Sequence, residues 1–538
     1  MKKWLIKKLD ENKDFIILCL LIFFGFLLRL KPLLTGSFPF SFDMGRDFLW
    51  TRDIVVLKKP TLIGPWGSLQ GIFFGPGWFY LLTIPFLIFN GHPVGGVALC
   101  LFFNLLTVLL AFMVGSKIKD RGLGLIFAAT LIFSKTMINL SSFAFHANLL
   151  PFTTLIITYS LYKLFFTKDK PQLFFLGIAA FATSFNFHLE PATAIFSTLT
   201  IFTFILYLVF SQKINFKFKS LMFGLVGFIT PFVPQIIFEF RHNFLQTRSL
   251  LAYFAGNNES LEGKLPFWQR VGDRFTKFLG FYSETLPFNH PIVKIFIFIV
   301  ILVVFLSLKK KDNLKKLFIV LFSVLLIPFF GFIFIFPPEL KQWYLYGLPV
   351  IYSFLLAIGL REVYSKNLIG KVFVSLFLAS YLLTLDLGYR LKYFEKTEFF
   401  SNFDGEVQAV NYIYQDSSGK PFKVYVFTPP VYEYGYQYLF WWRGRQNGYW
   451  PEEYAYLPGK TDYVPNKERY NLLQSQTQGK QETDMIYLII ESKTGKGFDG
   501  WYGRFADSKL LEEKKMKTGL IIQKRQATKT DVTIDEDE

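Results

Sequence analysis

The sequence predicts an α-helical protein that crosses a membrane many times and carries a small α/β domain at its C-terminal end. Of its 538 residues, 52% are hydrophobic and 20% are aromatic, which is rare in a soluble chain of this length. Apolar runs of about 18 residues or more, long enough to cross a bilayer as helices, recur before residue 390. Beyond that residue the apolar runs shorten to the length of strands, and tyrosines become more frequent.

The placement of positive charge agrees with this fold class. The formal net charge is +18, but Lys and Arg lie mostly in short loops between apolar runs. That placement orients membrane helices and forms no groove for a polyanion, so nucleic acid is not expected as a partner. Cys19 and Cys100 lie inside apolar runs, which predicts neither a disulfide nor a cysteine metal site. The lysine-rich N-terminus leads into the first apolar run without a cleavage pattern, so we expect an uncleaved anchor.

We expect about eleven membrane spans. The run from Trp78 to Asn90 is too short to span, so we interpret it as re-entrant or interfacial. With that choice, nearly all lysines and arginines of the short loops fall on the cytoplasmic side with the N-terminus, as the positive-inside rule requires. The expected spans are 15–34, 94–116, 122–140, 149–167, 171–188, 192–211, 219–239, 291–308, 315–336, 342–360 and 368–388.

This topology divides the chain into three parts. Residues 1–390 form a transmembrane domain with outer loops at 35–93 and 241–290, residues 391–529 form a soluble α/β domain outside the cell membrane, and residues 530–538 form an acidic disordered tail. In the α/β domain, strands are expected at Phe422–Thr428, Met485–Glu491 and Thr518–Gln523, and helices at Gly405–Gln415 and Tyr434–Trp442.

Polar residues gather at the outer membrane edge in this topology. All five histidines and several acids lie there, and no charge lies at a span centre. A site that faces the outer surface needs this segregation, whereas a transporter places ionisable groups near the membrane midplane.

The stretch from Ser41 to Asp47 follows the first span and holds the candidate catalytic acids, Asp43 and Asp47. It opens a helix over Gly45–Lys58 that we expect to lie along the membrane. Asp43 is a candidate general base or a helix N-cap. Asp47, one turn later, is a partner acid or a solvated neighbour. Arg46 between them binds a phosphate or neutralises Asp43.

Other candidates lie in the outer turns. His146 and Asn148 contact substrate or cap the next span. His188 and Glu190 are candidate metal ligands, but two ligands are too few to establish a site, and structural pairing is favoured. A divalent metal therefore stays open, and no other cofactor is predicted.

Two further groups of polar residues lie beside late spans. Glu239, Arg241 and His242 close the seventh span, and they are more polar than capping requires. Lys341, followed by Tyr344, is the exceptional lysine of the short outer turns. It is a candidate phosphate ligand or an interfacial anchor.

No Walker loop, dinucleotide-binding glycine motif, zinc signature or serine triad signature is apparent. Soluble nucleotide-sugar chemistry thus has no support, which favours a lipid-borne substrate. Taken in order, the first span, the outer loop opening at Asp43, the helix and the aromatic run resemble the GT-C type glycosyltransferases. These are the protein O-mannosyltransferase and aminoarabinose transferase superfamily, which use polyprenyl-phosphate sugars.

The resemblance covers about residues 1–390 and assigns roles by position. Asp43 resembles the catalytic acid of the family, although Met44 replaces the Glu that often follows it. The Gly75–Tyr80 run resembles the proline-rich aromatic run, but Phe73-Phe74 stand where Glu-Lys is frequent. The Lys341–Pro349 segment resembles the basic segment that opens a late span, which implies a phosphate contact.

The resemblance implies a transferase at the outer face of the plasma membrane. Its donor would be a polyprenyl-phosphate sugar and its acceptor a hydroxyl of a protein, lipid or glycan, within a shell of membrane lipids. Asp43 would take the acceptor proton in an inverting displacement, while Lys341, Arg241 or Arg46 stabilises the leaving phosphate. A lipid-linked glycan transporter and a non-enzymatic assembly protein are the alternatives.

Overall fold

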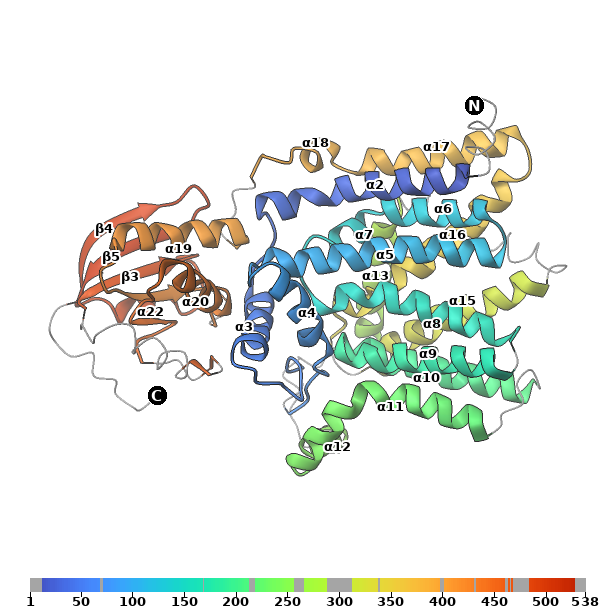
Figure 1. Ribbon diagram of the computed structural model, residues 1–538, viewed down its shortest axis with the longest axis horizontal. Coiled ribbons are helices and arrows are strands. Elements are labelled where there is room, and N and C mark those ends of the chain that lie inside the picture. Colours follow the sequence, from blue (N-terminus) through green and yellow to red (C-terminus); the bar gives the residue numbers. More distant parts are fainter. Residues whose placement is uncertain are drawn as a thin grey trace.

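The computed structural model describes residues 12–67, 71–167, 169–211, 218–255, 266–287, 312–336, 339–396, 401–429, 432–459, 463–464, 466–467 and 483–527. Up to residue 396 it contains α2 (Lys13–Thr35), α3 (Phe42–Val56), α4 (Gly77–Ile88), α5 (Val94–Ile118), α6 (Arg121–Phe133), α7 (Lys135–Leu140), η1 (His146–Leu149), α8 (Leu150–Leu164), α9 (Asp169–Phe185), η2 (Asn186–His188), α10 (Pro191–Phe210), α11 (Phe218–Arg241), α12 (Leu245–Phe254), α13 (Phe267–Thr285), α15 (Asp312–Phe330), η4 (Gly331–Ile335), η5 (Gln342–Leu345), α16 (Leu348–Tyr364), α17 (Leu368–Thr384) and α18 (Leu387–Arg390). Figure 1 shows the long helices side by side, with a sheet domain beyond one end and α3 and α4 at the junction.

Five helical segments are long and apolar enough to cross a membrane, judged by length and composition. They are α2, α5, α10, α11 and the segment Asn313–Ile335, which joins α15 to η4. The prediction of a multispan helical membrane protein is confirmed at this level. The expected span 291–308 lies outside the described residues, and the other expected spans correspond to shorter helices.

The expected span 122–140 is interrupted at Ser134. There α6 ends, and the Ser134 side-chain oxygen accepts a hydrogen bond from the Met137 N–H, which caps the first turn of α7. The apolar pattern continues across the break, so periodicity alone did not locate it. Helix α4, with 12 residues, is about 18 Å long and is shorter than the hydrocarbon core of about 30 Å.

The C-terminal domain is a five-stranded mixed sheet with helices packed on it. Its elements are α19 (Phe403–Ser417), β1 (Lys423–Phe427), α20 (Tyr434–Asn447), β2 (Glu453–Ala455), β3 (Met485–Ile490), α22 (Phe498–Gly503), β4 (Lys509–Lys515) and β5 (Ile521–Gln526). The strand order is β2-β1-β3-β5-β4. β1 runs parallel to both β2 and β3, and β5 runs antiparallel to β3 and β4. The two predicted helices and the strands predicted at β1 and β3 are confirmed. The strand predicted at Thr518–Gln523 is shifted, since Thr518 and Gly519 lie in the turn before β5, and β2, β4 and α22 are additional.

Helix α3 differs from the expected interfacial helix because its polar face is not turned to water. Arg46, Asp47, Arg52 and Asp53 are each at most 5% exposed. The helix packs between α4 and α20, so it joins the transmembrane part to the sheet domain. Neighbouring opposite charges make this burial tolerable, since each arginine pairs with the aspartate next to it.

The segment before α3 is also fixed by the sheet domain. The N–H of Phe403 donates to the carbonyl of Phe38 at 2.9 Å, and the two rings stack with centroids 5.0 Å apart. Within the interface, Gly45 of α3 lies against Gly435 of α20, and a Cβ at Gly45 would overlap the backbone of Tyr434 and Gly435. The closeness of the two helices therefore depends on glycine.

Replacing Gly45 by alanine is expected to separate α3 from α20 and to destabilise the protein by about 1–3 kcal/mol, as overpacking does. The thermal midpoint of the purified full chain measures this loss. Gly500→Ala is the matched control, because a Cβ at Gly500 meets nothing within 4 Å. If Gly45→Ala is as stable as this control, the close packing of the two helices is wrong.

Candidate functional site

The candidate site begins at the first turn of α3. Ser41 occupies the N-cap position, so the capping interpretation of Asp43 is wrong: Asp43 lies inside the helix. Its side chain is 47% exposed, whereas the side chains of Arg46 and Asp47 are 4% and 2% exposed. The spacing i, i+3, i+4 brings the three side chains to one region of the helix surface.

Arg46 and Asp47 form a fully paired network beneath Asp43. The Arg46 guanidinium lies 3.0 Å from Oδ1 of Asp43 and donates to Oδ1 of Asp47 at 2.8 and 3.0 Å. The other Asp47 oxygen accepts a hydrogen bond of 2.7 Å from the indole N–H of Trp78 on α4. Both oxygens of Asp47 are thus engaged, which suits a residue that holds Arg46 and Trp78 in place.

The two aspartates therefore differ in accessibility. Burial raises the pKa of Asp47 to about 6, against the lowering effect of Arg46. Asp43 forms an ion pair with Arg46 through one oxygen, and its second oxygen accepts no hydrogen bond within the described ranges. Of the two aspartates, Asp43 is therefore the one whose carboxylate is open to solvent.

Aromatic rings surround the Asp43–Arg46 pair. The guanidinium carbon lies 5.7 Å from the ring centroids of both Phe42 and Trp66. Trp66 and Tyr432 are 41% and 43% exposed, and Tyr434 links them by ring contacts. Exposed rings beside a carboxylate offer flat apolar faces to a ligand.

The glycine- and proline-rich loop before α4 packs tightly under this region. The N–H of Gly77 donates to Nδ1 of His188 at 2.8 Å, and a Cβ at Gly75 would overlap the same imidazole. The Gly75–Tyr80 run therefore forms a turn and the start of α4, and His188 positions that turn.

His188 and Glu190 do not form a metal centre. His188 is engaged with Gly77, and Glu190 caps α10 by accepting from the Ala192 N–H. Across the described ranges, no group of three or more His, Cys, Asp or Glu side chains could hold a metal ion. In the described part of the chain, His188 and Glu190 therefore have no third ligand that would complete a metal site.

His146 and Asn148 lie close to the site but are held by their own neighbours. The buried His146 donates through Nδ1 to the Leu189 carbonyl, and its ring lies 5.0 Å from that of Phe74. Burial and the charge of Arg46 lower the pKa of His146 to about 3, so the ring is neutral. Asn148 donates to the carbonyl of Phe143 at 2.8 Å and is buried beside Cys100.

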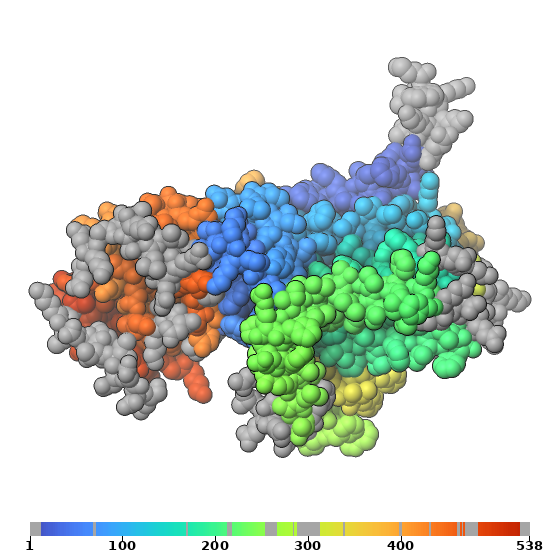
Figure 2. Space-filling view, turned by 60° about the horizontal axis from the view of Figure 1, so that its bottom comes forward, coloured from blue at the N-terminus to red at the C-terminus, as the bar shows by residue number. Residues whose placement is uncertain are grey.

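Glu239 has a structural role at the junction of α11 and α12. It accepts from the N–H groups of Gln246 and Thr247, both at 3.0 Å, and so caps α12. Arg241 and His242 are exposed, and His242 stacks on the ring of Phe238. Figure 2 shows α11 and α12 along one face of the molecule, beside the α3 region.

Lys341 and Tyr344 open α16 near the His146 turn. Lys341 pairs with Glu339, which also binds Lys277 of α13 at 3.2 Å. Tyr344 is 7% exposed, and its carbonyl accepts from Thr193 at 2.7 Å. Between them, the ring of Trp343 lies 6.1 Å from that of Phe145, so this segment and the η1 turn are adjacent.

Sequence reasoning missed Trp78, Trp66 and the tyrosines of α20. Trp78 is separated from Asp47 by 31 residues, and Tyr434 approaches from the other end of the chain. The aromatic content of both segments was the available signal, but aromatic residues are equally frequent at membrane interfaces.

Comparisons with known proteins agree with this architecture. Residues 122–218 match a family described as "Family of unknown function (DUF5968)". No curated protein matches the sequence. The crystal structure of ArnT from Cupriavidus metallidurans bound to undecaprenyl phosphate is similar, with a TM-score of 0.60 at 10% identity over 95% of this chain and 98% of that chain. The apo form of the same protein gives 0.58 at 11% identity, over 94% and 97%.

ArnT is an aminoarabinose transferase of the GT-C type. The similarity extends over nearly the whole of both chains, including the C-terminal domain. The fold expected from the resemblance is therefore confirmed.

The raised pKa of Asp47 can be tested through the pH dependence of the protein's stability. Its pKa rises from an ordinary 3.8 to about 6 on folding, so the folded state keeps a proton that the unfolded state has already lost. Stability due to Asp47 must then fall as pH rises through this window. The thermal midpoint of the wild type, relative to Asp47→Asn, is expected to decrease between pH about 4 and about 6 and to level off above it. A difference that does not change with pH would contradict the buried, raised carboxyl.

Proposed function

We propose that this protein is a membrane glycosyltransferase that moves a sugar from a polyprenyl-phosphate donor to an acceptor hydroxyl. One observation carries the proposal: Asp43 presents a reachable carboxylate, held by a buried Arg46, at the junction of a GT-C fold. The ArnT structure with undecaprenyl phosphate supports a lipid-phosphate donor. The distribution of loop lysines and arginines supports an outer-face site in the plasma membrane.

The proposed reaction is a single displacement with inversion at the anomeric carbon. The acceptor oxygen attacks that carbon, a new glycosidic C–O bond forms, and the C–O bond to the lipid phosphate breaks with its electron pair leaving on phosphate. Asp43 takes the proton of the acceptor hydroxyl. Its free oxygen suits this role, whereas Asp47 has no oxygen to spare and acts as a positioning residue.

Arg46 serves this scheme indirectly. It is buried between two carboxylates, so its charge is already balanced, and it orients Asp43 without contacting the phosphate. Lys341 and Arg241 are the proposed cations for the leaving phosphate. Glu339 holds Lys341 beside the η1 turn, and Arg241 is exposed at the end of α11.

The proposal predicts that Asp43→Asn loses sugar transfer. Without a base, the rate is expected to fall by about 100-fold or more. The measurement follows loss of the sugar from a panel of polyprenyl-phosphate sugars, with purified full chain and candidate acceptors.

Asp484→Asn is the control, because it removes an exposed carboxylate from the far end of the sheet domain. Unchanged thermal midpoints must show that both variants fold. Near-normal turnover by Asp43→Asn would rule out its role as the base.

A further inference from the structure

A cavity lies in the seam between α3 and the sheet domain, next to the candidate site. Its volume is about 220 Å³. One wall is Phe40-Ser41-Phe42, immediately before Asp43, and the opposite wall comes from the ends of β1 and β3 and the start of α20. Ser41, Pro429 and Tyr432 are exposed, so the cavity opens to solvent there.

The topology of the sheet places this cavity where ligands bind in α/β folds. Thr428 follows β1, and Glu491 follows β3, which is the parallel neighbour of β1. From β1 the chain goes to β2 on one side and then crosses to β3 on the other side. Crevices at the carboxyl ends of strands, where the strand order reverses in this way, are the usual binding positions.

The floor of the cavity carries unsatisfied acceptors. Glu406 is 2% exposed, and among the described residues neither its Oε2 nor the buried hydroxyl of Thr428 has a hydrogen-bond partner. Glu491 accepts a hydrogen bond of 3.2 Å from the Tyr436 hydroxyl. Burial and the charge of Glu491 hold the pKa of Glu406 well above its usual range, and burial raises the pKa of Glu491 to about 7.

A buried carboxyl with an open oxygen, beside a second carboxyl that is half-buried, is costly unless a cation joins the two. We propose that this seam cavity binds a primary ammonium group of a ligand, between the Glu406 and Glu491 carboxylates. The ammonium donates to the open oxygens of Glu406 and Thr428, and its charge restores the ionised form of the pair.

An ammonium group fits better than a metal ion. Glu406 and Glu491 belong to no group of three or more ligands within the described ranges that could hold a metal. The rings of Phe42 and Tyr432 lie 6.3 Å apart beside the opening, and they offer cation–π and apolar contact to an organic cation and its stem. The volume also exceeds what a bare ion fills.

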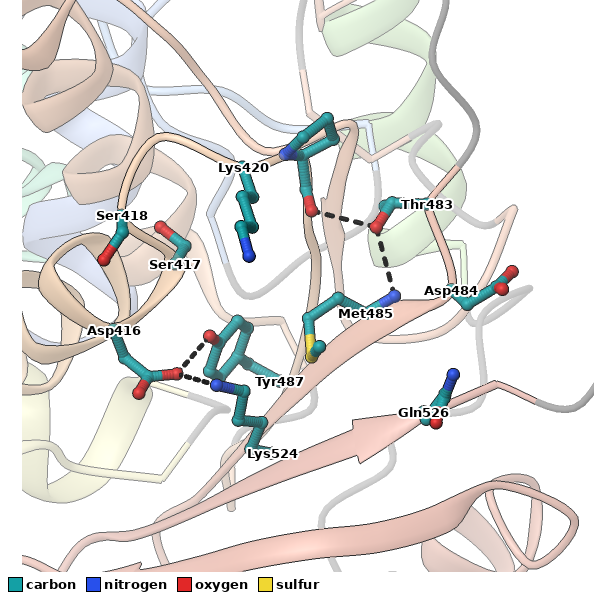
Figure 3. Close-up of a pocket in the computed structure, with 11 residues that line it drawn as sticks. Asp416, Ser417, Ser418, Lys420, Thr483, Asp484, Met485, Tyr487, Lys524 and Gln526 are labelled. Atoms are coloured by element: carbon teal, nitrogen blue, oxygen red, sulfur yellow. Dashed lines mark hydrogen bonds and ion pairs between the residues drawn. The ribbon is translucent and has the colours of Figure 1, made fainter.

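A larger cavity, of about 620 Å³, lies at the opposite, amino ends of β1 and β3. Its acids differ from those of the seam cavity in how they are paired. There the carboxylate of Asp416 already pairs with Lys524 at 2.7 Å and accepts from the Tyr487 hydroxyl (Figure 3). Asp416 is thus compensated by Lys524, and Asp484, the other acid of this cavity, is exposed to solvent, so neither requires a bound cation.

The position of the seam cavity suggests what the bound group belongs to. Ser41 and Phe42 join the cavity to Asp43, so an ammonium in the cavity would bring the rest of its molecule to the proposed base. The interpretation of the ligand as the acceptor rests on the proposed function. The binding of an ammonium group in the cavity is independent of that function.

The test is a calorimetric titration of the purified full chain in lipid nanodiscs, without sugar donor. Ethanolamine and glucosamine are the probes, and they distinguish a lipid-headgroup amine from an amino sugar. Ethylene glycol and glucose are their neutral counterparts. We expect at least one amine to bind saturably and its neutral counterpart to bind at least about 10-fold more weakly.

Glu406→Gln and Glu491→Gln should each weaken that binding by about 10-fold or more, while Asp484→Asn in the other cavity leaves it unchanged. The comparison of charged and neutral probes on the wild type needs no variant, so it stands even if one variant misfolds. Absence of saturable amine binding, equal binding of the neutral compounds, or binding of Ca²⁺ alone would overturn the proposal. Because no donor is present, these results are independent of whether the protein transfers a sugar.

Discussion

The structure depends on the compensation of one buried guanidinium. Arg46 is 3% exposed, and a charge in such a position is stable only when partners surround it. Asp47 supplies one partner from the same helix, Asp43 a second, and the rings of Phe42 and Trp66 the remaining faces. Each of these groups is thereby fixed in place, and the indole of Trp78 completes the network from α4. The exposed carboxylate of Asp43 is thus paired through one oxygen with an arginine that is itself buried.

Helix α3 also shows how one element can serve two domains. On one side it packs against α4 and the transmembrane helices, and on the other against α20 of the sheet domain. The Gly45–Gly435 approach and the Phe38–Phe403 stack hold this arrangement together. The candidate base and the acids of the seam cavity are neighbours for this reason, although Glu406 and Glu491 lie more than 350 positions after Asp43 in the chain.

Much of the fold could be predicted from the sequence, because hydropathy and charge placement are local signals. The long apolar helices and β1, β3 and β5 follow from them, whereas β2 is only three residues long and β4, which carries a run of charges, has no alternating pattern. The Asp43–Arg46–Asp47 group was recognisable because helical spacing brings it together. Other roles were not, since they depend on distant partners. Glu239 resembles a ligand until the N–H groups that it caps are seen, and His188 resembles a metal ligand until Gly77 is found against it.

The position of α20 has a consequence for biosynthesis. Helix α3 is complete once the ribosome has passed residue 56, but the surface that covers its charged face begins at residue 434. During the synthesis of most of the chain, the buried arginines and aspartates of α3 must stay accessible to water or to a holding factor. The two sides of the site are thus synthesised at different times, so a nascent or truncated chain that lacks α20 carries the candidate base without its finished surroundings.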